Sequence, residues 1–156
     1  MKPQDLLVAE LAPILREAGF RKERSTWRRA EAETILVLNL QKSNWAENFF
    51  INLGVYFRML GPEENPPSHR CHLNCRAERI PAAMPFLSRA LDFYPPTDVS
   101  EEERRSAIRE IAGHALIWLR ARSTVDGARL EHQADSHTGC MLHIEARDLL
   151  ELPSTR

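Results

Sequence analysis

The residues best suited to chemistry in this chain are amides, aromatic rings and basic groups at alternate positions of strand-like segments. Asn39, Asn52 and Tyr56 stand within the segments 34–42 and 48–57, where apolar residues would be expected in a buried sheet. Alternate side chains of a strand share one face, and amides both donate and accept hydrogen bonds. The candidate binding residues of this face are Asn39, Gln41, Phe50, Asn52, Tyr56, His72, Asn74 and Arg76. They predict a recognition surface for a protein, a peptide or a small ligand.

The same pattern also fits a polar face that is only solvated. Antiparallel sheets commonly leave one face in water, and the amides would then bond to one another or to the C-terminal segment. The two interpretations differ in what lies over Asn39, Asn52 and Tyr56: water, residues 124–156, a second subunit or a ligand.

Basic residues gather in the segment 21–29, which holds Arg21, Lys22, Arg24, Arg28 and Arg29 against only Glu23. With Arg76 and Arg79 they would suit phosphates, while Phe50 and Tyr56 would stack single-stranded bases. Charge on an edge strand also protects it against aggregation. Because the net charge is only −1, the protective role is favoured and nucleic acid is an alternative.

Cysteine and histidine offer few candidates for a metal site. On a strand, Cys71 and Cys75 would lie about 13 Å apart, too far to share one zinc ion. His137, Cys140 and His143 recur every three residues, which would place them on one face of a helix, but a glycine between them disfavours a helix and no fourth ligand follows. We therefore predict no metal and no cofactor, with these three residues as the remaining candidates.

Catalytic motifs are not found in the sequence. It contains no glycine-rich phosphate loop, no nucleophile elbow and no paired histidine–glutamate metal motif. His72 can be proposed as a base and Ser43 as a nucleophile, although Ser43 is more simply a turn residue. A non-catalytic binding module is the favoured prediction, and an uncharacterised enzyme is an alternative.

The hydrophobic pattern predicts the elements that position these residues. Helices are expected at 3–18, 82–91 and 100–122, and strands at 20–30, 34–42, 48–57 and 69–77. Pro13 should kink the first helix or split off its last turn, and Gly19 should end it. Ser100 precedes Glu103 by three residues, which is the spacing of a capping box.

One face of the predicted sheet is apolar. In the strand 48–57 it comprises Phe49, Ile51, Leu53, Val55 and Phe57, and in the fourth strand Cys71, Leu73, Cys75 and Ala77. The predicted core comprises Trp27, Leu38, Leu40, Ile51, Leu53, Val55, Ile108, Ile111, Ala115 and Leu119.

These elements predict a two-layer α+β fold, with an antiparallel sheet of about four strands packed against an N-terminal and a long C-terminal helix. Residues 1–156 are expected to form a single domain with a helix–sheet–helix core at 1–122. Residues 124–156 form a tail, in which 125–139 is predicted to be turn and loop. Residues 140–152 fit either a strand followed by a short helix or one helix throughout.

Several short segments in order resemble a known family. They are "GFRKERSTWRR" (19–29), "LNLQKS" (38–43), "FFINLGVYF" (49–57), "CHLNCRAERI" (71–80) and "ALIWL" (115–119). Over about residues 5–122 the chain resembles the bacterial family known as domain of unknown function 4304. The resemblance implies a small bacterial cytoplasmic α+β domain and implies no reaction.

Composition is that of a packed domain, with 43% hydrophobic and 28% charged residues. No secretory signal is recognised, and no apolar run reaches the roughly 20 residues of a membrane helix. The odd number of cysteines, three, predicts free thiols in a reducing cytoplasm. A protein or small-ligand partner is expected, and a homodimer is possible.

Overall fold

A computed structural model of the chain describes residues 1–134 and 139–151. Its α-helices are α1 (Pro3–Glu17), α2 (Met84–Leu91), α3 (Glu101–Ala121), α4 (Val125–Ala134) and α5 (Ile144–Glu151). Its strands are β1 (Arg21–Glu23), β2 (Thr26–Ala30), β3 (Thr34–Lys42), β4 (Phe49–Phe57), β5 (Leu73–Arg76) and β6 (Met141–Leu142). Single 3-10 turns follow at η1 (Arg58–Leu60), η2 (Ser68–Arg70) and η3 (Ala77–Arg79).

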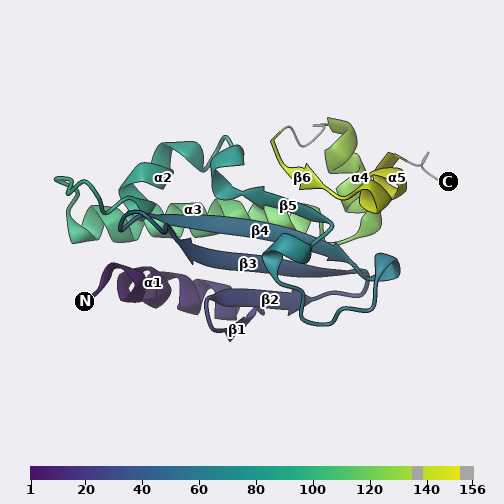
Figure 1. The fold of residues 1–156 in the computed structure, drawn as a ribbon, viewed down its shortest axis with the longest axis horizontal. Helices are drawn as coiled ribbons and strands as arrows, with labels where there is room; N and C mark the ends of the chain where they lie inside the picture. The colour runs from purple at the N-terminus through teal and green to yellow at the C-terminus, as the bar shows by residue number, and fades with distance from the viewer. Residues whose placement is uncertain (135–138, 152–156) are drawn as a thin grey trace.

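The strands form one antiparallel sheet in the order β1-β2-β3-β4-β5-β6, so each strand pairs with its neighbour in the sequence (Figure 1). β3 and β4 form its centre, with Leu38 opposite Leu53 and Asn39 opposite Asn52. The predicted α+β class is confirmed, although the sheet has six strands instead of about four.

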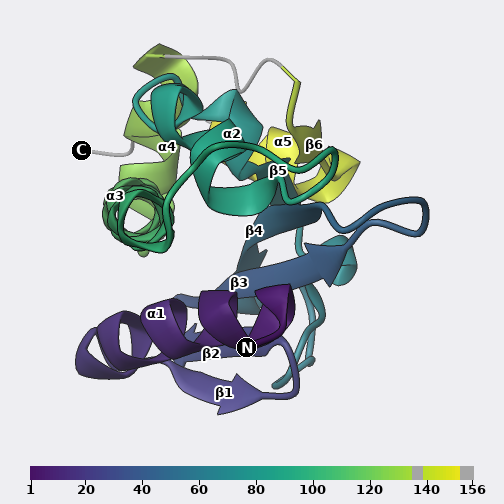
Figure 2. The same cartoon turned by 90° about the vertical axis from the view of Figure 1, so that its left-hand side faces the viewer.

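Helices α1 and α3 lie on the same side of this sheet (Figure 2). The face beneath them carries the alternate leucines of β3 and the odd-numbered residues of β4, as predicted. Every residue predicted for the core is buried. Glu10 of α1 joins the two helices, because its carboxylate pairs with Arg105 at 2.6 Å and with Arg109 at 3.1 Å.

The helix ends follow the sequence signals closely. α3 begins with the predicted capping box, in which Glu103 N–H donates to Ser100 Oγ and Ser100 N–H donates to the Glu103 carboxylate. α1 is followed by Gly19 at a φ of 89°, a left-handed conformation that favours glycine. The last turn is not split off at Pro13, because α1 continues through this residue to Glu17.

The predicted strand at 20–30 is wrong in one respect, since it is a hairpin of β1 and β2. Arg24 takes a φ of 56° at the turn, and Arg21 then lies opposite Arg28. The fourth strand is also shorter than predicted, because the chain forms 3-10 turns on both sides of Leu73–Arg76.

The tail is more ordered than the sequence suggested. Residues 125–134 form α4 where turn and loop were expected, and the strand-then-helix alternative is the correct one after residue 140. Figure 1 shows α4, α5 and β6 gathered at one end of the molecule beside β5. Ala128, Leu149 and Leu150 of this segment join the main hydrophobic core. No helix in the described residues is long and apolar enough to cross a membrane.

Part of the sheet face away from α1 and α3 is covered by the connection between β4 and β5. Figure 2 shows this connection descending on that side, and Ile35, Val37, Tyr56 and Cys71 form a small second core there. Gly54 permits the approach, since a Cβ at this position would lie 2.6 Å from Cys71 Sγ. The prediction that Cys71 faces the main core is therefore wrong.

The prediction of free thiols is also wrong for the other two cysteines. Cys75 and Cys140 form a disulfide with 4.6 Å between their Cα atoms, whereas Cys71 is free and buried. The bond ties the centre of β5 to the residue just before β6, so it anchors the tail to the sheet.

Candidate functional site

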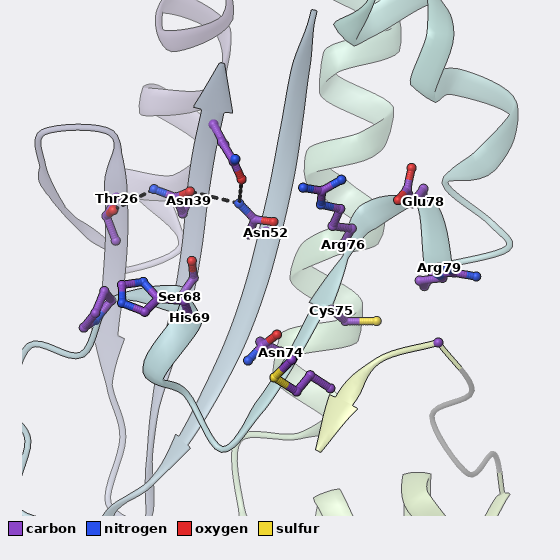
Figure 3. A pocket seen from close by; sticks show the side chains of 14 residues that line it. Thr26, Asn39, Asn52, Ser68, His69, Asn74, Cys75, Arg76, Glu78 and Arg79 are labelled. Carbon is purple, nitrogen blue, oxygen red and sulfur yellow. Dashed lines mark hydrogen bonds between the residues drawn. The ribbon is translucent and has the colours of Figure 1, made fainter. Parts of the chain in front are cut away.

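A row of polar side chains crosses the sheet on its uncovered face. The strand register places Thr26, Asn39, Asn52 and Arg76 opposite one another on β2, β3, β4 and β5. Figure 3 shows Thr26, Asn39 and Asn52 in line, with Arg76 on the next strand. This row exists because the β3 and β4 leucines turn toward the helices and leave their neighbours on the other face.

Hydrogen bonds hold the amides of this row in fixed orientations. Asn39 Nδ2 donates to Thr26 Oγ1 at 3.0 Å, and Asn52 Nδ2 donates to Asn39 Oδ1 at 3.1 Å. Asn52 Nδ2 also donates to Gln41 Oε1 at 2.9 Å. The amides therefore bond to one another, as the interpretation of a solvated face expected, and these bonds also give each amide a defined direction.

The row forms the floor of a groove of about 800 Å³. Pro67, Ser68 and His69 of the β4–β5 connection form one wall, and Arg79, Gly139 and Met141 are part of the other. The covered half of the sheet thus gives the groove its depth. Glycine at position 139 lets the second wall pack closely on Arg79, because a Cβ there would lie 2.8 Å from Arg79 Nε.

Arg76 lies at the end of the row with its guanidinium stacked on an aromatic ring. Its Cζ is 4.0 Å from the centre of the Phe50 ring, a cation–π contact that orients the guanidinium plane. Phe50 itself stands at the edge of this groove in a smaller neighbouring hollow of about 110 Å³.

The candidate binding residues do not all meet in one place. Asn39, Gln41, Asn52, Asn74 and Arg76 line the groove, and Phe50 contacts it through Arg76. Tyr56 and His72 were predicted on the same open surface. They are instead buried, Tyr56 beneath the β4–β5 connection and His72 as the last residue of that connection, and both border a separate cavity of about 490 Å³.

His72 is held in an orientation that does not suit a general base. Its Nδ1 accepts a hydrogen bond from Phe57 N–H at 3.0 Å, so in the neutral ring the proton lies on Nε2. Burial lowers the pKa of His72, His143 lowers it further, and Glu145 opposes both. The ring is therefore kept neutral with its lone pair already in use.

Cys71 does not supply a nucleophile to the same cavity. Burial raises the pKa of its thiol to about 12, although Arg28 acts in the opposite direction. A thiol reacts as its thiolate, so this side chain remains protonated at neutral pH.

The candidate metal residues do not form a site in the described parts of the chain. The sulfur of Cys140 is bonded to Cys75, His137 lies outside the described residues, and His143 packs edge-on against His72 with 5.9 Å between ring centres. Across residues 1–134 and 139–151, no group of three or more possible ligands has a metal-binding arrangement.

Arg28 and Arg29 of the basic segment are engaged with the protein itself, whereas Arg21 and Arg24 are exposed and have no partner among the described residues. Arg28 pairs with Glu23 at 3.2 Å and donates to Pro66 O, and Arg29 pairs with Glu31 at 2.7 Å. The stacking surfaces required for nucleic acid are also occupied, since the Tyr56 ring is buried and Arg76 covers Phe50.

Sequence reasoning did not include several residues of the groove. Thr26 belongs to the polar row, and the predicted burial of the adjacent Trp27 was the available signal, because neighbouring residues of a strand face opposite sides. His69, Gly139 and Met141 come from distant segments, and no local signal assigns them to the groove. Arg79 was noticed only as a possible extension of a basic patch.

The fold and the site together define a class of protein, an α+β domain with a polar groove on one face of a meander sheet. Within this class, residues 11–121 match the family model described as "Domain of unknown function (DUF4304)". The match covers more than half of the chain, which therefore belongs to this family. No curated protein and no solved structure matches the chain. All but the tail residues of the groove lie inside the matched segment.

Proposed function

We propose that this protein is a non-catalytic binding module that takes a small polar ligand into the groove above Asn39 and Asn52. The observation that carries the proposal is the oriented row of amides at the floor of a concave site. A solvated sheet face needs no walls, whereas this row is flanked by two of them.

The size and lining of the groove support a small ligand over a flat protein interface. Its volume of about 800 Å³ falls within the range of roughly 300–1,000 Å³ that is usual for ligand sites. Gln41, Asn52 and Asn74 supply amide groups at the bottom, and amides give orientation and specificity to polar ligands. A protein partner or a second copy of the chain would instead favour an exposed apolar patch.

The neutral His72, whose Nδ1 already accepts a hydrogen bond, and the protonated Cys71 support a non-catalytic role. Neither group offers the base or nucleophile that an enzyme would use at this end of the sheet. The aromatic rings of Phe50 and Tyr56 are covered and cannot stack on bases. A small ligand is therefore favoured over nucleic acid.

The family resemblance supports a bacterial protein of the cytoplasm. The Cys75–Cys140 bond argues against that location, because disulfides are rare in the cytoplasm and persist in oxidising compartments. In the cytoplasm we therefore expect both cysteines as thiols, with the disulfide formed on exposure to an oxidant.

Side-chain amide signals in ¹⁵N-correlated NMR spectra test the proposal directly. A set of small polar compounds, both neutral and charged, is added to the ¹⁵N-labelled protein. Binding in the groove should shift the NH₂ signals of Asn39, Gln41, Asn52 and Asn74. The exposed loop residues Asn44 and Asn65 provide internal controls and should not move.

A groove-filling variant separates binding from general solvent effects. Asn74→Trp places a large ring inside the groove and should abolish the shifts. Gln133→Trp, on the exposed end of α4, should leave them unchanged. If no compound of any charge shifts the groove amides, or if Asn74→Trp binds as the wild type does, the proposed function is wrong.

A further inference from the structure

Arg76 of β5 differs from the two arginines of β2 in having no acceptor among the described residues. Arg28 and Arg29 each pair with a carboxylate and donate to a backbone carbonyl. Among the described residues, the recorded interaction of Arg76 is its contact with Phe50. A half-buried guanidinium with unused N–H groups loses hydration without recovering it from the protein.

The geometry of Arg76 leaves its hydrogen-bonding edge available. Because Cζ lies over the Phe50 ring, the guanidinium is held in place while its N–H groups keep no acceptor among the described residues. A guanidinium presented in this way matches a planar or tetrahedral oxyanion through two parallel hydrogen bonds. Figure 3 shows the guanidinium directed toward the strand that carries Asn52.

The surrounding charges also favour an anion. Arg79 lines the same groove, and Glu78 is the acidic residue of its described lining. Glu78 forms no ion pair with Arg76 in the described residues. The side-chain oxygen of Gln41 accepts a hydrogen bond from Asn52, so the NH₂ group of Gln41 remains as a further donor. Gln41 lies opposite Phe50 in the strand register.

We propose that the ligand of this groove carries an anionic oxygen group, a carboxylate or a phosphate, and that Arg76 binds that group. The proposal rests on the proposed function, because it names the chemistry of the ligand for the same groove. Arg76 supplies the charge and the paired donors, Phe50 holds its plane, and the amide row reads the polar remainder of the ligand.

The test compares matched small ligands at constant ionic strength. Succinate and pyrophosphate represent the two sources of the anion, and succinamide is the neutral counterpart of succinate. Each is titrated while the Gln41 and Asn52 NH₂ signals are followed, with sodium chloride as the reference. We expect succinate or pyrophosphate to bind at least tenfold more tightly than succinamide, and the tighter of the two identifies the source.

Substitutions test whether Arg76 is the residue that binds the anion. Arg76→Gln should weaken binding of the preferred anion at least tenfold and leave succinamide unchanged. Arg120→Gln is the matched control, because Arg120 is exposed on α3 outside the groove. Thermal unfolding and the backbone spectrum of each variant report that the fold is kept.

Several results would overturn the inference. These are anions that shift the groove signals no more than chloride does, an Arg76→Gln protein that binds them as the wild type does, and equal losses in Arg76→Gln and Arg120→Gln. A single-stranded RNA that displaces pyrophosphate and binds more tightly would replace the small ligand by a nucleic acid. If neutral compounds still shift the groove amides, the proposed function survives these failures.

Discussion

Asn52 owes its orientation to its neighbours on β3. Its Nδ2 donates to both Asn39 Oδ1 and Gln41 Oε1, so both amide hydrogens are used. The Oδ1 atom then remains as an acceptor, and Figure 3 shows it on the side of Arg76. A ligand that places an anion on Arg76 would therefore complement Asn52 best with a hydroxyl or N–H donor.

The buried histidine makes stability depend on pH. His72 has a pKa below its ordinary value in the folded protein, chiefly because of burial, with His143 acting in the same direction. The unfolded chain binds a proton first as the pH falls through about 6.5, so the free energy of unfolding should decrease below that pH. Urea unfolding at a series of pH values between about 7.5 and 5 measures this slope.

Two variants test whether His72 causes this pH dependence of the free energy of unfolding. His72→Asn keeps an acceptor for Phe57 N–H and removes the titrating ring, so its stability should depend less on pH over this interval. His69→Gln, which changes an exposed histidine, should retain the wild-type slope. A wild-type slope in His72→Asn would contradict the assignment.

Tyr56 and His72 show which part of the site the sequence could not predict. Alternation placed Tyr56 correctly on the polar face of β4, but it does not report that the 58–72 connection folds back over that face. Gly54 was the available signal, because a glycine inside a strand often marks the close approach of another segment. Asn39, Asn52 and Arg76 were predictable because their surroundings depend only on strand register.

At the level of elements, the wall formed by the tail depends on few contacts with the sheet. β6 has two residues and pairs only with Leu73 and Asn74 of β5. The disulfide from Cys140 to Cys75 reinforces this pairing. It also fixes Gly139 and Met141 beside the groove, so the shape of one wall is linked to the oxidation state of the pair.

Loss of the disulfide should therefore lower stability. The bond closes a loop of 65 residues, for which the loss of entropy in the unfolded chain corresponds to about 4 kcal/mol. Cys140→Ser should lower the free energy of unfolding by about this amount, and dithiothreitol should lower it similarly in the wild type. Urea unfolding with and without the reductant provides the measurement.

Cys71→Ala is the control for thiol chemistry, because Cys71 is free. It should keep the response to dithiothreitol, whereas Cys140→Ser should lose it. A thiol titration of the denatured, unreduced wild type should find one reactive group. Three reactive groups under oxidising conditions would contradict the disulfide.

For the whole molecule, long periodic segments were predictable and connections were not. The helix at 100–122 and the strands at 34–42 and 48–57 carry strong hydrophobic patterns, and the structure confirms them within a residue or so at each end. α4 was missed because its sequence contains Gly127 and few apolar residues. The tail disulfide was missed because pairing of distant cysteines depends on the fold, and an odd cysteine count does not exclude a bonded pair.

The single domain predicted for residues 1–156 has a direct test in cooperativity. Leu149 and Leu150 of α5 are buried in the same hydrophobic core as the sheet and α3, so the tail should unfold together with the family segment at 11–121. Far-UV circular dichroism and tryptophan fluorescence should then give coincident urea transitions. Leu150→Ala should lower the free energy of unfolding by about 2–5 kcal/mol as measured by either probe. Arg147→Ala, at an exposed residue, should change it by no more than about 0.5 kcal/mol. Separate transitions, or a Leu150→Ala shift confined to one probe, would show that the tail is an independent unit.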